Sequence, residues 1–197
     1  NGGQFTHGDD DPLSSASLYL NSWPCFLAQY WLHEIDRRWR HDRDNWTGLN
    51  EEERTALIGL LRGPRAALDA TQPAIARVLQ FLFAADEDFT VEHVLPLFSE
   101  AASAIFAWHS YLYSPRWNDR ILAAGLLEST RALWERLDEL GGRGHRDQFF
   151  GFVAAILSWA GIDAHSRHGL LTQSVLSANG AHAADFAAKV SRFIAKD

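Results

Sequence analysis

Residues 22–40 read SWPCFLAQYWLHEIDRRWR, and this stretch decides the fold class. Its apolar side chains recur at every fourth position, the spacing of one face of an α-helix: Leu27, Trp31, Ile35 and Trp39. Ser22 is a typical N-cap residue, and Pro24 fits the first helical turn because its missing N–H has no partner there. The stretch therefore predicts a helix that buries one aromatic-rich face.

The helical period continues along the chain, and no segment alternates apolar and polar residues over the length of a strand. Proline, glycine and N-cap residues divide the chain into short segments. We expect further helices from Asn50 to Gly63, shortly after Pro64, and at 73–85, 90–98 (with Thr90 as N-cap), 101–113, 115–140, 146–160, 166–178 and 183–195. The predicted fold is all-α, with about nine or ten short helices in an irregular antiparallel array or a short α-solenoid.

The N-terminal residues differ in composition from the helical part. Residues 1–15 contain glycine, polar residues and the run Asp9-Asp10-Asp11, so we expect a flexible acidic leader or linker there. Residues 16–197 are expected to form a single helical domain. The glycine-rich linker 141–144 is the one internal point at which this domain divides.

The net negative charge of the chain argues against two kinds of binding partner, nucleic acids and anionic membranes. The chain of 197 residues has 18 Lys and Arg and 25 Asp and Glu, a formal net charge of −7. Nucleic acids and anionic membrane surfaces attract proteins with a surplus of positive charge, so we expect neither as a partner. The single cysteine, Cys25, excludes an internal disulfide and a multi-cysteine zinc site.

Two further features concern location and completeness. No apolar run approaches the ~18 residues of a membrane span, and the N-terminus has no secretory signal, so we expect a cytoplasmic protein. Methionine is absent from the sequence. This absence indicates that the chain is a piece of a longer polypeptide, whose function the piece need not carry by itself.

The nine histidines raise the question of a metal site. The tightest cluster is Asp163, His165 and His168, in which the two histidines are spaced to share one side of a helix start. The spacing matches no established metal signature. We therefore expect no metal site, and we interpret the cluster as a helix N-terminus capped by Asp163 or Ser166.

No other group of residues in the sequence forms a recognisable catalytic motif. The chain lacks a Gly-x-Ser-x-Gly motif and a glycine-rich phosphate loop, and we expect Cys25 to be a small core residue. The carboxylates Asp86, Glu87 and Asp88 fall in a turn between two helices. We interpret them as a solvated approach to a helix N-terminus, with an acid/base or cation site as the alternative.

Two of the eight tryptophans are candidate interface anchors. Trp46 lies in a polar segment, and Trp117 is flanked by Arg116 and Asn118, with Arg120 nearby. The alternative is that both rings fold back onto the core beneath a loop. We expect most of the other tryptophans to fill space between helices.

Two stretches resemble a known family. The first is FLFAADEDFT at 81–90, continued by HVLPLF at 93–98, and the second is RWNDR at 116–120, leading into LAAGLL at 122–127. With the helix and turn at 31–46, they resemble the large helical C-terminal region of bacterial proteins that carry an N-terminal sirtuin-like domain. Many such proteins are antiphage defence factors, and their sirtuin-like domain degrades NAD once infection is sensed. The resemblance implies a non-catalytic helical portion that binds its own catalytic domain or a phage protein.

Three functions remain open. The first is a non-catalytic sensor, regulatory or scaffold domain of a larger bacterial defence protein, with protein partners, and we favour it. The second is a small-ligand-binding or metal-binding helical enzyme domain with a pocket between helices, in which Asp163, His165 and His168 would be the candidate metal ligands. The third is a purely structural domain that forms homo-oligomers. Under the first function we expect no enzymatic activity in this chain and no cofactor, with Trp46, Asp86, Glu87, Asp88, Arg116, Trp117, Asn118 and Arg120 as interaction residues.

Overall fold

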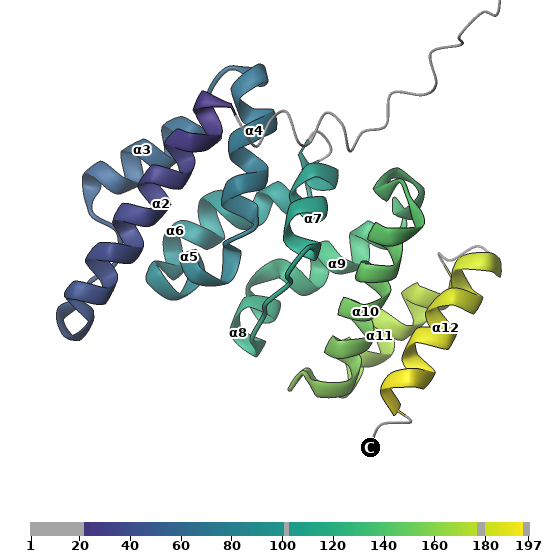
Figure 1. Ribbon diagram of the computed structural model, residues 1–197. Helices are drawn as coiled ribbons and strands as arrows, with labels where there is room; N and C mark the ends of the chain where they lie inside the picture. The colour runs from purple at the N-terminus through teal and green to yellow at the C-terminus, as the bar shows by residue number, and fades with distance from the viewer. Residues whose placement is uncertain (1–21, 101–102, 177–179, 195–197) are drawn as a thin grey trace, which may run out of the picture.

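A computed structural model describes residues 22–100, 103–176 and 180–194 (Figure 1). All regular structure in these residues is helical, without a strand, and this confirms the all-α prediction. In the same part of the chain, none of the helices combines the length and the apolarity that crossing a membrane requires. The leader predicted at 1–15 lies outside the described residues.

The first three helices pack on one another at one end of the molecule (Figure 1): α2 (Trp23–His41), α3 (Glu51–Leu61) and α4 (Arg65–Ala76). The start of α3 is a capping box, as an Asn followed by Glu at the third helical position favours. The Asn50 side chain accepts a hydrogen bond from Glu53 N at 2.9 Å, and the Glu53 carboxylate accepts one from Asn50 N at 2.9 Å. Asn50 is thus the N-cap that the sequence predicts.

The predicted break at Pro73 is wrong. α4 runs through this proline to Ala76, and the next helix, α5, spans Leu79–Ala85. A proline inside a helix removes one backbone hydrogen bond. Ile75 and Ala76 directly after it are fully buried, and this packing of an apolar helix face favours continued helix.

The predicted N-cap at Thr90 is also wrong. The short helix α6 (Glu87–Phe89) begins four residues earlier, with Asp86 as its N-cap, and Asp86 Oδ1 accepts a hydrogen bond from Phe89 N at 3.0 Å. Thr90 is buried, and its hydroxyl donates to the Asp86 carbonyl at 2.8 Å. The chain then continues as a π-helical turn and a 3₁₀ turn at Thr90–Val94 and Leu95–Phe98.

The long helix predicted at 115–140 is divided into shorter pieces. After α7 (Ala104–Leu112), the chain is non-helical to Asn118, and α8 (Asp119–Ile121) leads through a π-helical turn into α9 (Leu127–Trp134). Gly125 causes the interruption, because its φ of 137° is a conformation that side-chain-bearing residues rarely adopt. A 3₁₀ turn at Leu137–Leu140 ends this part of the chain.

The last three helices form the other end of the molecule: α10 (Arg143–Trp159), α11 (Ala164–Leu176) and α12 (Gly180–Ile194). The predicted glycine-rich linker at 141–144 is shorter than expected. Gly141 turns the chain with a φ of 71°, and α10 already begins at Arg143, so Gly144 is helical. The linker is therefore a tight turn between two packed elements.

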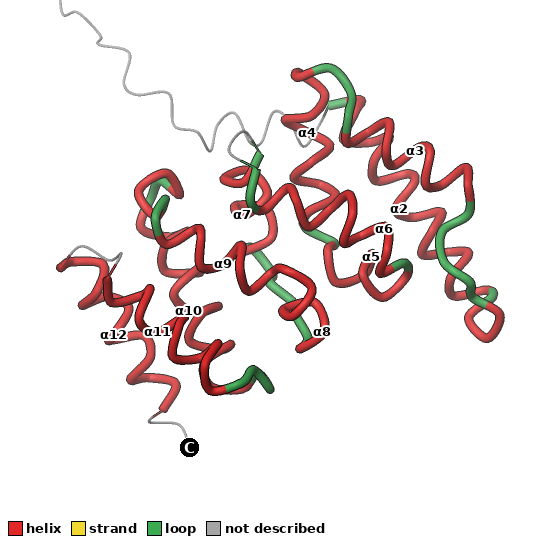
Figure 2. The backbone as a smooth tube through the Cα atoms, turned by 180° about the vertical axis from the view of Figure 1, so that it is seen from behind, coloured by secondary structure: helices red, strands yellow, loops and turns green. Residues whose placement is uncertain are grey.

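The helices follow one another through space in the order of the sequence. Contacts join α2 to α4, α4 to α7, α7 to α10, and α10 to α12. Figure 2 shows the same progression from behind, with α2 and α3 at one end and α12 at the other. The most extensive contacts thus join helices that are separated by one or two others in the sequence. These pairs follow one another along the molecule, as in a short α-solenoid.

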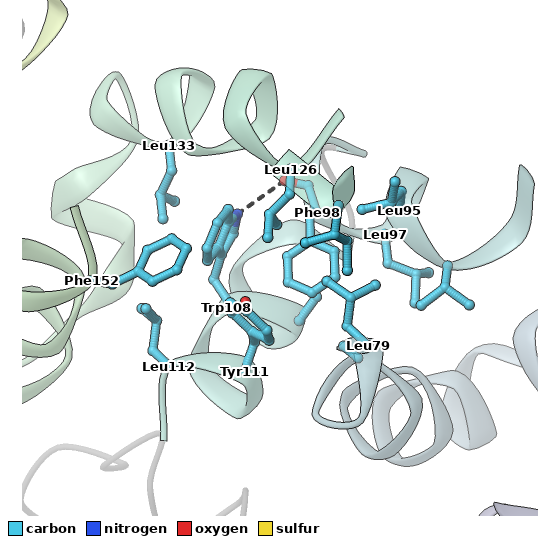
Figure 3. Packing of buried hydrophobic residues seen from close by; sticks show 14 of the residues in the cluster. Leu79, Leu95, Leu97, Phe98, Trp108, Tyr111, Leu112, Leu126, Leu133 and Phe152 are labelled. Atoms are coloured by element: carbon cyan, nitrogen blue, oxygen red, sulfur yellow. Dashed lines mark hydrogen bonds between the residues drawn. The ribbon is translucent and has the colours of Figure 1, made fainter. Parts of the chain in front are cut away.

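The core is centred on the fully buried Trp108 of α7 (Figure 3). Its indole Nε1 donates a hydrogen bond to the Phe98 carbonyl at 3.0 Å, and the Phe98 ring meets it edge-on at 5.0 Å between centroids. Phe149 and Phe152 of α10 approach it from the other side, at 6.1 and 6.0 Å. The core therefore continues across the turn at Gly141, which positions α10 against α7.

Candidate functional site: an aromatic surface groove

The loop that follows α7 is held in a fixed path by three hydrogen bonds. The Tyr111 hydroxyl donates to the Arg116 carbonyl at 2.7 Å, and the Asn118 side chain accepts from Ile121 N at 2.9 Å as the N-cap of α8. Asp119 Oδ1 accepts from Gly161 N, at the end of α10, at 2.9 Å. These hydrogen bonds hold the loop alongside the C-terminal half of α10.

One face of α10 forms the opposite wall. Gln148, Phe152, Ala155 and Trp159 follow the i, i+4, i+7, i+11 spacing that places side chains on a single helix face. Gly151 on the same face leaves room for a close neighbour, because a Cβ there would lie 3.3 Å from Lys189 Cε of α12.

A groove of about 450 Å³, open to solvent, lies between these two walls. Its rim carries exposed aromatic rings, since Tyr113 is 72% and Trp159 64% exposed. Trp117 is half-buried and packs against the core from the loop side. The groove is lined by Leu112, Tyr113, Pro115, Trp117, Gln148, Gly151, Phe152, Ala155 and Trp159.

Charged groups of both signs lie beside the groove: two arginines next to its aromatic residues, and Asp119, which bonds Gly161 at the end of α10. The Arg77 guanidinium lies over the Tyr113 ring, 5.0 Å from its centroid, and Arg116 is exposed on the loop beside Trp117. No carboxylate among the described residues forms an ion pair with either arginine. Lys189, by contrast, is paired with Asp147 at 2.9 Å.

Trp46, the other predicted anchor, is held in a structural role. Its indole Nε1 donates to the Ala85 carbonyl at 2.6 Å, and the Arg38 guanidinium lies over its ring at 4.0 Å. Arg38 also forms a bidentate ion pair with the buried Glu53, with hydrogen bonds of 2.8 and 2.5 Å. The ring therefore folds back onto the core, which is the alternative that the sequence left open.

The predicted carboxylate cluster separates into three different environments. Asp86 is buried, and besides capping α6 it accepts hydrogen bonds from Leu49 N at 3.0 Å and from Arg54 at 2.5 Å. Glu87 forms an ion pair with Arg120, so two of the predicted interaction residues bind each other. Asp88 is exposed.

The predicted histidine cluster is a helix start. Asp163 accepts hydrogen bonds from Ser166 N at 2.8 Å and from Ser166 Oγ at 2.6 Å, which makes Asp163 the N-cap of α11. The serine hydroxyl and amide lower the pKa of Asp163. His165 and His168 are exposed, and His168 Nε2 lies 3.4 Å from Thr172 Oγ1. Within the described residues, no three His, Cys, Asp or Glu side chains are placed to hold a metal ion.

Two groups with raised pKa values, a thiol and a phenol, lie inside the fold. Burial raises the pKa of the Cys25 thiol, and Gln29 donates a hydrogen bond to its Sγ. Burial also raises the pKa of the Tyr111 hydroxyl, which donates to the loop as described. Both groups are protonated and serve the packing of the structure.

A second hollow of about 280 Å³ lies between the 3₁₀ turn at Leu95–Phe98 and α9. It is lined mainly by small and aliphatic side chains, with Glu128 as its charged group. The groove between the 113–117 loop and α10 is larger and carries the aromatic side chains that anchor most protein interfaces, so we regard it as the candidate site.

Sequence reasoning identified one wall of this groove and missed the other. Trp117 and Arg116 were expected to take part in an interaction surface, whereas Trp159 was expected among the core tryptophans. Trp108 and Trp134 are indeed fully buried, but Trp159 and Trp23 are exposed. The signal for Trp159 was its place at the end of α10, where the helix leaves the core.

Comparison with known proteins adds no assignment, since no family model, curated protein or solved structure matches the chain.

Proposed function

We propose that this chain is a non-catalytic, partner-binding module of a larger bacterial defence protein, and that it acts in the cytoplasm. The observation that carries the proposal is the groove between the 113–117 loop and α10, with its exposed Tyr113 and Trp159 and its half-buried Trp117. Tyrosine and tryptophan bury large areas at a small loss of conformational entropy, which is why they dominate the binding energy of protein interfaces.

The chemistry of the groove supports binding rather than a reaction. Its polar side chains are an amide, a phenol and two indoles, at Gln148, Tyr113, Trp117 and Trp159. Acid–base catalysis needs a group whose protonation changes near neutral pH, and nucleophilic catalysis needs an activated hydroxyl, thiol or amine. The lining supplies hydrogen-bond donors and apolar surface, which are the means of recognition.

The sensor role rests on the sequence resemblance. One of its two stretches, residues 116–120, contains Trp117 and Arg116 and forms a wall of the groove. The partners that the resemblance suggests are a phage protein and the protein's own NAD-degrading domain. Occupation of the groove by the first would then release or activate the second.

Phage challenge of cells that carry the complete gene tests this function. We expect Trp159→Ala and Trp117→Ala to abolish protection and infection-dependent loss of NAD, measured by plaque counts and by NAD assay. Leu176→Ala is the matched control, because Leu176 is 76% exposed at the end of α11 and does not line the groove. Full protection by both groove variants would contradict the proposal.

One observation favours a second candidate, self-association through α2. Trp23, Phe26 and Tyr30 are spaced i, i+3, i+7 and are all exposed, so they form an apolar stripe on one side of the helix. Under this candidate, Trp23→Ala lowers the mass measured by light scattering at micromolar concentration and Trp159→Ala leaves it unchanged. A monomeric wild-type chain removes the candidate.

A further inference from the structure

We infer that the groove binds an extended, proline-containing and acidic segment of a partner polypeptide. This inference rests on the proposed function and specifies its ligand. Three properties of the groove carry it: the stacking surfaces of its rim, its polar groups that can donate hydrogen bonds, and the two arginines beside it.

The rim offers flat apolar surfaces to an extended chain. Tyr113 and Pro115 stand on the loop and Trp159 stands on α10, so the rings border an open channel. Polyproline II segments have three residues per turn and present proline rings along an edge, which lets them dock in aromatic-lined channels. Such segments also lose little conformational entropy on binding, which favours them in a shallow site.

The hydrogen-bonding groups of the groove are matched to a chain with few N–H donors. The Trp117 indole N–H, the Tyr113 hydroxyl and the Gln148 amide line the groove, and none of the three bonds another described residue. An indole nitrogen only donates, and a polyproline II segment leaves its carbonyl oxygens unpaired. Proline lacks a backbone N–H, so a proline-containing segment supplies acceptors to these donors without an unmatched donor of its own.

The charge beside the groove selects for acidic side chains. Arg77 at the Tyr113 ring and Arg116 beside Trp117 have no carboxylate partner among the described residues. The whole sequence carries a net charge of −7, whereas these two guanidinium groups lie beside the groove without an ion-pair partner among the described residues. Carboxylates of a bound segment near these guanidinium groups would form charge-assisted hydrogen bonds.

Fluorescence anisotropy with labelled synthetic peptides of about ten residues tests the inference on the full chain. The probe peptide alternates proline pairs with glutamate. In one comparison peptide alanine replaces every proline, and in another lysine replaces every glutamate. We expect each comparison peptide to bind at least about tenfold more weakly than the probe.

Variants then connect the binding to the groove. Trp159→Ala weakens the probe peptide at least about tenfold, and Trp23→Ala changes its dissociation constant less than about twofold. Combined Arg77→Gln and Arg116→Gln weakens it about three- to tenfold, and this difference shrinks as salt screens the charges. Circular dichroism and thermal melting of each variant check that the fold is retained. Equal binding of the proline-free peptide, or unchanged binding by Trp159→Ala, overturns the inference.

An unbiased peptide library displayed on phage separates this inference from the proposed function. Enriched peptides that need Trp159 but contain neither proline nor acidic residues overturn the inference and leave the groove as a binding site. A library that yields no peptide dependent on Trp159 or Trp117 overturns both. Enrichment of acidic, proline-containing sequences that compete with the probe peptide supports both.

Discussion

Asp86 connects three separate segments, and its removal should destabilise the fold more than any neighbouring acidic residue. Its carboxylate accepts hydrogen bonds from Phe89 N, the third residue of α6, and from Leu49 N in the loop before α3, both at 3.0 Å. It also pairs with Arg54 of α3 at 2.5 Å. The substitution Asp86→Ala removes all three interactions and leaves no acceptor in their place.

The magnitude follows from the three contacts. Loss of an N-cap costs about 1 kcal/mol. A buried backbone N–H without a partner, here that of Leu49, costs about 1–3 kcal/mol. The Arg54 side chain is 37% exposed, so solvent screens its ion pair and the loss adds little. We therefore expect a decrease of about 2–4 kcal/mol in the free energy of unfolding, and of about 4–15 °C in Tm.

Urea titration followed by circular dichroism measures this change, with Asp88→Ala as the matched control. Asp88 carries the same charge two residues away but is exposed, so its replacement should change stability by less than about 0.5 kcal/mol. Asp86→Asn keeps one acceptor oxygen and should fall between the two. If Asp86→Ala and Asp88→Ala prove equally stable, the carboxylate does not join the segments and the reasoning is refuted.

Three further predictions concern other positions. Gly125→Ala should lower the free energy of unfolding by about 1–3 kcal/mol, because alanine is strained at a φ of 137°. Gly59→Ala in α3, where a Cβ meets no neighbouring atom, should raise it by about 0.5–1 kcal/mol. Equal effects of the two substitutions in a thermal melt would contradict this reasoning. Gly161→Ala should lower the free energy of unfolding by about 1–3 kcal/mol, since its Cβ would lie 2.5 Å from Asp119 Oδ2. In an Asp119→Ala background the same substitution should lower it less, and a double-mutant cycle measures the difference. Burial lowers the pKa of His109 in the folded protein, so the unfolded chain binds a proton on this side chain more readily. The folded state is therefore fully stable above the ordinary histidine pKa of about 6.5, and its free energy of unfolding should decrease as the pH falls below that value. The urea midpoint of His109→Gln should depend less on pH in this range than that of the wild type, and an unchanged dependence would refute the assignment.

The fold class could be predicted because local rules determine it. The period of residues 22–40 and the N-cap signal at Asn50 act within one helix, and both helices form where they are expected. Of the predicted apolar stripe Ile35 is buried and Leu27, Trp31 and Trp39 are half-buried, whereas Phe26 and Tyr30 beside it are exposed. The capping residue Asp163 belongs to the same class, since an N-cap bonds an amide three residues away. These features need no knowledge of what packs against them.

The errors occurred where tertiary packing decides the local structure. Pro73 was expected to begin a helix, but buried side chains after it keep α4 continuous. Gly125 falls within the long helix predicted at 115–140, and only its φ in the folded chain shows the interruption. Sequence alone could not place Trp46 either, because the carbonyl that binds it belongs to Ala85, 39 residues further along the chain.

The candidate site could be predicted only in part, for the same reason. The loop residues Arg116 and Trp117 stood out because an aromatic ring among polar neighbours is unusual. The other wall is formed by α10, and its distance from the loop is set by the packing of Trp108 against Phe149 and Phe152. A local sequence pattern cannot give the distance between the loop and α10, so the groove could be identified only from the folded structure.

The most direct test of the binding groove is the NMR spectrum of the tryptophan indole N–H groups during titration with the proline–glutamate peptide. The eight indole signals report separate parts of the molecule. We predict that the signals of Trp117 and Trp159 shift as the peptide saturates, while those of Trp23 and of the buried Trp108 stay in place. Shifts confined to Trp23, or no indole shift at saturating peptide, would contradict the account.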